Sequence, residues 1–115
     1  QQRLLLARAL AQEAPLLLLD EPTTHLDLQY QISLLDAVRS LVDQGGLTVV
    51  MTLHDLNLVS RYADHLCLLV EGRLEANGTP DEVLEPGLLS RVYKVPLQRM
   101  QTGEGGRPII LPTVV

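Results

Sequence analysis

The chain has 115 residues, of which 46% are hydrophobic and 20% charged, a composition typical of a folded domain and not of a disordered tail. Its formal net charge of −5 argues against the clustered Lys and Arg of a nucleic-acid-binding surface, so we expect no nucleic-acid partner. No apolar run approaches the ~20 residues that a membrane-spanning helix needs.

The first predicted elements are a helix and a short strand. Apolar residues recur at helical spacing over residues 1–13, and Pro15 ends that pattern. Leu16–Leu19 is a continuous apolar run that acidic residues end, which is typical of a strand buried on both faces of a parallel sheet. Because the chain begins at Gln1, without methionine and inside the first helix, we expect it to be a piece of a longer protein.

Helix and strand continue to alternate after this point. Apolar residues at helical spacing predict a helix over Leu28–Asp43, and Gly45-Gly46 supplies its end. The β-branched run at 47–53 predicts a second buried strand, and Asp55 is placed to cap the helix that follows. This alternation predicts the α/β class, with parallel pairing in the first part of the chain.

A β-hairpin is expected next. Leu66–Val70 and 73–77 are strand-like and flank a turn at Glu71-Gly72. The single cysteine, Cys67, lies in the first of these runs, so we expect a buried and inert thiol. One cysteine cannot form an internal disulfide, which fits a reducing compartment.

The last third of the chain opens with a helix-start signal. Thr79 is placed as the N-cap, Pro80 as the first helical residue and Glu82 as the third. Two short helical pieces, at 81–84 and 88–93, and a loose, glycine- and proline-containing tail over 101–115 are expected to follow.

The adjacent acids Asp20 and Glu21 carry the clearest chemical signal. In open α/β sheets ligands bind outside the carboxyl ends of the strands, where these two residues lie. Transfer of a phosphoryl group to water needs an acid that holds Mg²⁺, directly or through its waters, and a base that orients or deprotonates the water. An ordinary junction between strand and loop is the alternative, and the longer string LLLLDEPT followed by Leu26-Asp27 disfavours it.

Four segments, in this order, resemble the ABC ATPases. Leu4 to Leu10 after Gln-Gln-Arg is similar to the helix after the ABC signature, and LLLLDEPT resembles the Walker B motif. Residues 24–27 resemble the D-loop, with Thr24 where serine is usual, and His54 ends a segment similar to the switch-histidine loop. The resemblance covers roughly 1–95. It implies the C-terminal half of a P-loop NTPase parallel sheet flanked by helices, with a short hairpin and small C-terminal helices.

The resemblance also implies a role for each matching residue. It implies a partial nucleotide-binding domain over 1–100, with ATP and Mg²⁺ as cofactors. Asp20 is then the carboxylate on the Mg²⁺ side, and Glu21 is the general base. Asp27 lies at the seam between two subunits and couples their ATP sites, whereas His54 contacts the γ-phosphate and holds Glu21 and the water. His25 and His65 have no such context and are expected to be surface or structural residues.

The segments that bind the triphosphate in this family have no match in the chain. No G-x-x-x-x-G-K-[ST] sequence occurs, and the signature Leu-Ser-Gly-Gly and the adenine-stacking aromatic are also missing. In the family these parts precede the position where Gln1 begins. We therefore expect the chain to be an inactive fragment of an active ATPase when it is taken alone.

The segment after His54 is similar to the ATPase subunits of importers for iron–siderophore complexes, haem and cobalamin. HDLN, RYAD and GTPDEVL carry this likeness, and zinc/manganese and phosphonate importers share parts of it. The implied partners are a second copy of the ATPase subunit, membrane permease subunits and an extracytoplasmic binding protein. The implied location is peripheral, on the cytoplasmic face of the cell membrane.

Two alternatives remain open from the sequence. Soluble ABC ATPases that act on ribosomes or DNA carry a similar Walker B string, although Asp55-Leu56-Asn57 and the acidic charge disfavour them. The chain could also be a truncated, non-enzymatic remnant. The DNA upstream of Gln1 would separate these cases.

Overall fold

A computed structural model of the chain describes residues 15–101, 103 and 106–113. The chain divides into two compact units, Gln1–His54 and Asp55–Val115. The helix expected over 1–13 lies outside the described residues. None of the helices in the described part of the chain is long and apolar enough to cross a membrane.

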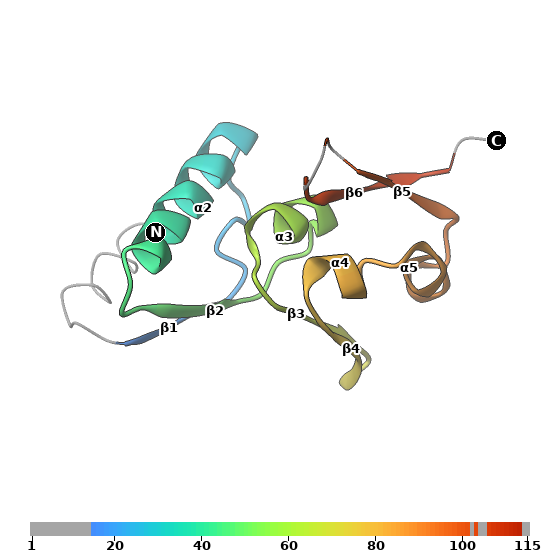
Figure 1. The fold of residues 1–115 in the computed structure, drawn as a ribbon, viewed down its shortest axis with the longest axis horizontal. Coiled ribbons are helices and arrows are strands. Elements are labelled where there is room, and N and C mark those ends of the chain that lie inside the picture. The colour runs from blue at the N-terminus through green and yellow to red at the C-terminus, as the bar shows by residue number, and fades with distance from the viewer. Residues whose placement is uncertain (1–14, 102, 104–105, 114–115) are drawn as a thin grey trace. The chain divides into compact units, whose positions relative to one another are not determined.

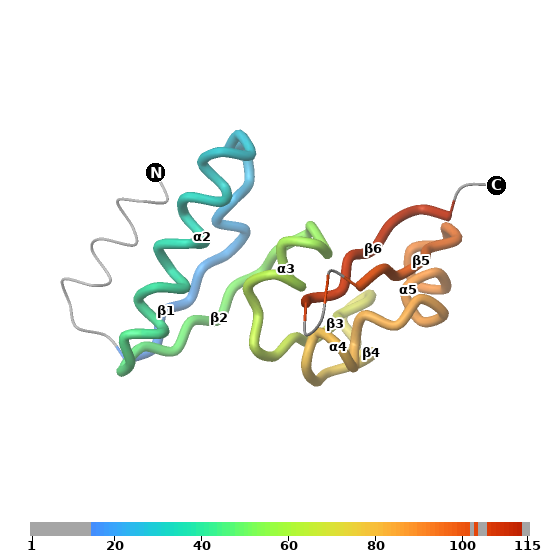
Figure 2. Tube along the Cα trace, turned by 45° about the horizontal axis from the view of Figure 1, so that its top comes forward, coloured from blue at the N-terminus to red at the C-terminus, as the bar shows by residue number. Residues whose placement is uncertain are grey.

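The first unit contains two parallel strands joined by a helix. β1 (Leu16–Leu19) pairs with β2 (Thr48–Met51), and α2 (Leu28–Asp43) connects them. Parallel strands need a crossover connection, for which a helix is the usual solution. Figures 1 and 2 show the two strands side by side, with α2 next to them. The predicted α/β class and parallel pairing are confirmed here.

Among the residues that the structure describes, helix α2 covers one face of the β1–β2 sheet. The buried cluster on that face consists of Leu17, Leu19, Leu34 and Val38. Successive side chains of a strand point to opposite faces, so Leu18 and Val50 lie on the other face, where they are 69% and 54% exposed. The expectation that this strand is buried on both faces is therefore not met in the described residues, because α2 is a single helix and covers a single face.

The second unit begins with a capped helix. α3 (Leu56–Tyr62) starts after Asp55, whose carboxylate accepts hydrogen bonds from the backbone N–H groups of Asn57 at 2.8 Å and Leu58 at 3.2 Å. These bonds satisfy two of the four N–H groups that have no partner within the helix. The predicted capping role of Asp55 is confirmed.

A hairpin follows α3. β3 (Leu66–Val70) pairs in antiparallel orientation with β4 (Arg73–Gly78). The turn residues Glu71 and Gly72 have φ of 51° and 77°, and a two-residue hairpin turn of type I′ needs positive φ at both positions. Cys67 is exposed, so the expectation of a buried thiol is wrong. The buried position of β3 is its neighbour Leu68, and the alternation of a strand turns Cys67 to the other side.

Two short helices then begin with side-chain caps. α4 (Pro80–Val83) has the predicted capping box, in which Glu82 N donates to Thr79 Oγ1 at 3.3 Å and Thr79 N donates to Glu82 Oε1 at 3.1 Å. The donation from the Thr79 backbone, and then from its hydroxyl, lowers the pKa of the Glu82 carboxyl. α5 (Pro86–Tyr93) starts with a different cap, the Glu85 carboxylate, which accepts from the backbone N–H groups of Gly87 and Leu88, both at 2.8 Å.

The chain ends in an antiparallel pair of strands. β5 (Leu97–Gln101) pairs with β6 (Pro108–Pro112), so the loose tail expected over 101–115 differs from the structure at 108–112. A long-range contact explains the difference. The side chain of Asn57 donates from Nδ2 to the Ile110 carbonyl at 3.1 Å and accepts from the Ile110 N–H at 2.8 Å.

The core of the second unit gathers residues from several of these elements. It consists of Leu68, Val83, Leu84, Leu89 and Ile110. Ile110 is 5% exposed, so β6 contributes a buried side chain in addition to the hydrogen bonds that its backbone makes with Asn57 and Ser60 of α3. Figures 1 and 2 show β6 running beside α3. Burial and hydrogen bonding together order a segment whose composition alone suggests a loop.

The contact between Asn57 and Ile110 gives a first test. In the Asn57→Asp variant a carboxylate oxygen replaces Nδ2 and faces the Ile110 carbonyl, so one hydrogen bond is lost and two acceptors oppose each other. We expect the amides of β6 to exchange with solvent about 30-fold faster, which corresponds to about 2 kcal/mol of local stability. Hydrogen exchange measured by mass spectrometry checks this. The same change at Asn77, an exposed residue of β4, should leave the exchange of β6 unaltered.

Candidate active site

The carboxyl ends of β1 and β2 bring together two segments that are far apart in the sequence. Because the strands are parallel, the residues after Leu19 and the residues after Met51 emerge at the same edge of the sheet. Asp20 and Glu21 follow β1, and His54 follows β2 after two residues. This edge is where ligands bind in α/β sheets.

Glu21 and His54 are in direct contact. Glu21 Oε1 lies 2.6 Å from His54 Nε2. An ionised carboxylate can only accept, so Nε2 donates a hydrogen in this contact. The His54 side chain is 83% exposed and that of Glu21 41% exposed. Both groups are therefore reachable by a ligand or a water molecule.

The backbone at Glu21 is in a conformation that a glutamate rarely adopts. Its φ is 45°, in the left-handed region. A tight turn follows, in which Thr24 N donates to the Glu21 carbonyl at 3.1 Å and the Thr24 hydroxyl donates to Glu21 Oε2 at 3.4 Å. Pro22 and Thr23 are buried within this turn. A non-glycine residue in this region costs of order 1–2 kcal/mol, so the surrounding contacts must hold it there.

A residue that the sequence analysis did not single out joins the two acids. The Thr52 hydroxyl donates to Asp20 Oδ1 at 2.7 Å and accepts from the Glu21 backbone N–H at 2.8 Å. Thr52 stands where the pattern predicts the end of a strand, and nothing in its residue type indicates a site. The parallel register is the signal that could have found it, because the offset that pairs Leu19 with Met51 pairs Asp20 with Thr52.

Asp27 does not contact the other candidate site residues of the described part of the chain. It is the residue before α2, its carboxylate makes no capping bond, and it has no hydrogen bond or ion pair to another side chain of the described residues. Its backbone carbonyl accepts from Gln31 N at 2.9 Å. Asp27 is exposed and therefore accessible to groups outside this chain.

The donor groups fit one kind of metal site and not another. Among residues 15–101, 103 and 106–113 no group of three or more His, Cys, Asp or Glu side chains could hold a metal ion. A structural zinc site, which needs four such ligands, therefore has no counterpart there. Mg²⁺ is usually held by one or two carboxylates together with water and substrate phosphates, which a lone Asp20 carboxylate satisfies. His25 and His65 are both exposed, as the sequence analysis expects for surface residues.

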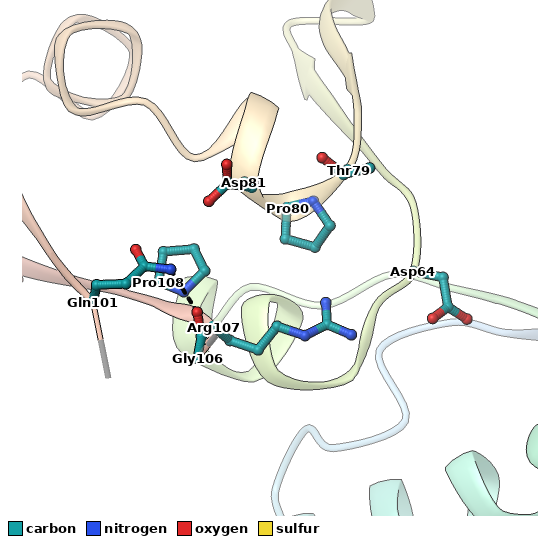
Figure 3. Close-up of a pocket in the computed structure, with 8 residues that line it drawn as sticks. All are labelled: Asp64, Thr79, Pro80, Asp81, Gln101, Gly106, Arg107 and Pro108. Carbon is teal, nitrogen blue, oxygen red and sulfur yellow. Dashed lines mark hydrogen bonds between the residues drawn. The ribbon is translucent and has the colours of Figure 1, made fainter. Parts of the chain in front are cut away.

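The second unit contains a hollow of about 410 Å³, which Figure 3 shows. Its lining comprises Asp64, Thr79, Pro80, Asp81, Gln101, Gly106, Arg107 and Pro108. Its polar groups already serve the fold. Arg107 Nη1 donates to the Ala63 carbonyl at 2.7 Å, and Gln101 Nε2 donates to the Gly106 carbonyl, the bond dashed in Figure 3. None of the predicted site residues lines this hollow, so the candidate site remains the edge of the β1–β2 sheet.

The sequence of the chain is similar to those of known transport proteins. No protein-family model matches the chain. The chain is 41% identical to the ferric enterobactin transport ATP-binding protein FepC of Escherichia coli over 112 residues, which are 97% of this chain and 41% of that protein. It is 47% identical to the hemin import ATP-binding protein HmuV of Streptomyces coelicolor over 110 residues, which are 96% of this chain and 39% of that protein.

The chain is a relative of the ATP-binding proteins of ABC transporters. The relatives that it resembles include ATP-binding proteins named for siderophore, hemin and cobalamin import. The chain spans about two fifths of the length of these ABC relatives, 41% of FepC and 39% of HmuV.

The fold points to the same ABC family. The structure superposes on an ABC transporter assigned to the metal-chelate type, seen in an inward-facing conformation, with a TM-score of 0.85 and 33% identity. That likeness covers 98% of this chain and 46% of the other. The α/β fold therefore matches part of an ABC ATPase. The roles predicted for Asp20, Glu21, Asp27 and His54 stay predictions, because their positions alone do not test them.

Proposed function

We propose that this chain carries the water-activating part of the ATP hydrolysis site of an ABC importer. The observation that carries the proposal is the contact of the Glu21 carboxylate with His54 Nε2, 2.6 Å apart, next to Asp20 at the edge of a parallel sheet. The names of the relatives, which are ATP-binding proteins of transport systems, support it. In this proposal residues 1–100 are one part of a larger P-loop nucleotide-binding domain.

Glu21 is the general base in this proposal. Its Oε1 is engaged by His54, whereas Oε2 accepts only the long 3.4 Å bond from the Thr24 hydroxyl. Oε2 can therefore accept a hydrogen bond, and then the proton, from a water molecule that attacks the terminal phosphate. His54 fixes the carboxylate from the other side. A general base in such a position contributes about 10²- to 10⁴-fold to a rate.

Asp20 is the carboxylate on the metal side. Its Oδ1 accepts from Thr52, and Oδ2 has no hydrogen bond within the described residues. Oδ2 is thus free to bind Mg²⁺ directly or through one of its waters. When bound, Mg²⁺ neutralises charge on the phosphates of ATP. The chain itself supplies two adjacent residues, Asp20 and Glu21, whose side chains are held in different directions.

The sequence of this chain contains no G-x-x-x-x-G-K-[ST] phosphate loop. The purified 115-residue chain should not hydrolyse ATP above the rate of buffer alone, because nothing in it cradles the β- and γ-phosphates. Release of inorganic phosphate, measured with and without Mg²⁺, checks this. A rate that the Glu21→Gln substitution abolishes would contradict it.

The proposed cargo is a metal chelate such as an iron–siderophore complex, haem or cobalamin. It rests on the relatives alone, since no residue at the candidate site would touch the cargo. The proposed partners are a second ATPase subunit, a membrane permease and an extracytoplasmic binding protein, at the cytoplasmic face of the cell membrane. Asp27, whose carboxylate is exposed and makes no capping bond, is proposed to meet the second subunit.

The test of this function uses the intact protein, expressed from its complete reading frame. It should co-purify with membrane permease subunits, and its ATP hydrolysis should be required for uptake of radiolabelled ferric siderophore by cells. Co-sedimentation with ribosomes would favour a soluble ABC ATPase instead. A stop codon directly upstream of the codon for Gln1 would favour a non-enzymatic remnant.

A further inference from the structure

The residue after β2 faces the residue after β1. The register pairs Leu19 with Met51, and Thr52 N donates to the Leu19 carbonyl at 3.1 Å, so the ladder extends one step beyond the strands. Thr52 is therefore held by its backbone at the level of Asp20. The backbone ladder alone therefore positions Thr52, without any contribution from its side chain.

The Thr52 hydroxyl makes two hydrogen bonds whose directions are forced. A backbone N–H can only donate, so the 2.8 Å bond from Glu21 N fills one lone pair of Oγ1. An ionised carboxylate can only accept, so the hydroxyl hydrogen points to Asp20 Oδ1, 2.7 Å away. The hydroxyl thus has one orientation, and that orientation links the backbone of Glu21 to the carboxylate of Asp20.

One of the two bonds orients the Asp20 carboxylate, and the other holds the backbone of Glu21. The proposed chemistry needs both residues in place. The bond to Oδ1 stops rotation of the Asp20 carboxylate and leaves Oδ2 as its free oxygen. The bond from Glu21 N holds the residue whose φ of 45° is unfavourable for a glutamate. That conformation directs the Glu21 side chain to His54.

We propose that Thr52 is a positioning residue that orients Asp20 and Glu21 together through its single hydroxyl. This inference rests on the proposed function, because it concerns the same hydrolysis site. Thr52 touches neither nucleotide nor water in this role and acts only through the two acids. It is exposed, and valine has nearly the same shape as threonine, so valine fits in its place.

The experiment compares Thr52→Val with Thr52→Ser in the intact protein. Valine keeps the shape and loses both bonds, whereas serine keeps the hydroxyl. We expect valine to lower kcat for ATP hydrolysis by about 10- to 100-fold. We expect the Mg²⁺ concentration for half-maximal rate to rise by about fivefold, because the Asp20 carboxylate then rotates freely. Serine should restore most of both values. Thr48→Val, an exposed threonine at the start of β2, is the matched control and should change neither.

A second measurement does not depend on activity. In the nucleotide-free protein, hydrogen exchange of the Glu21 amide should be about tenfold faster in the Thr52→Val variant and unchanged in the Thr52→Ser variant, since only the hydroxyl protects that amide. Unaltered Mg²⁺ dependence and Glu21 exchange in Thr52→Val would overturn the inference. Failure of the proposed function is a separate result, in which the Glu21→Gln variant hydrolyses ATP as fast as the unaltered protein.

Discussion

Replacing Glu21 with glutamine is expected to lower kcat for ATP hydrolysis by the intact protein about 10³-fold, within the range that a general base contributes. Glutamine keeps the length of the side chain and can still accept a hydrogen bond from His54, so the turn and its contacts are retained. It cannot take a proton from water. The affinity for ATP should be nearly unchanged, because the loss is confined to the reacting step. Steady-state phosphate release and nucleotide-binding titration measure the two quantities.

The chain offers a close control for this substitution. Glu71 is also a glutamate at positive φ, 51° against 45° for Glu21, but it lies in the hairpin turn of the second unit. Glu71→Gln imposes the same chemical change at a residue with a similar φ and should leave kcat as it is. Retention of more than a tenth of the original rate in the Glu21→Gln variant would refute the general-base role.

Replacing His54 with alanine is expected to lower kcat about 10²-fold, similar to the loss of one preorganised hydrogen-bond donor at an active site. The imidazole is the group that fixes Glu21 Oε1, at 2.6 Å. Its side chain is 83% exposed, so removing it should change the free energy of unfolding by no more than about 0.5 kcal/mol. A large loss of rate with almost no loss of stability is the result that distinguishes a role at the site from a role in the fold.

His65 provides the comparison for that experiment. It is an exposed histidine of the second unit, outside the candidate site, and His65→Ala should alter neither rate nor stability. Thermal unfolding and phosphate release, measured on both variants, decide the matter. If the His54 variant unfolds at a much lower temperature, its loss of rate no longer speaks for a catalytic contact.

The local elements were predictable because their signals are local. The four leucines before Asp20 predict β1, and the spacing of apolar residues predicts α2 within its observed bounds. The end of α2 is marked by Gly45, whose φ of 92° suits glycine. Thr79 and Glu82 form the capping box that their spacing predicts. Each of these features depends on contacts within a few residues.

The features that were missed depend on contacts across the chain. β6 is held by hydrogen bonds between Ile110 and Asn57, which lies 53 residues earlier in the chain. Local composition cannot predict a pair of residues so far apart. Thr52 contacts Asp20 and Glu21 only because β1 and β2 pair in one particular register. The proximity of Glu21 and His54 could be predicted, because a resemblance to a family carries long-range information that periodicity lacks. The contact expected for Asp27 cannot be checked in this single chain, since its expected neighbour belongs to another subunit.

The left-handed backbone at Glu21 has a consequence for how this gene evolves. Glycine at position 21 would fit a φ of 45° better than glutamate, by about 1 kcal/mol. The backbone conformation alone would thus favour glycine, asparagine or aspartate there, so we expect glutamate to be retained for its side chain. In a lineage that had lost the enzyme activity, codon 21 should be among the first to change.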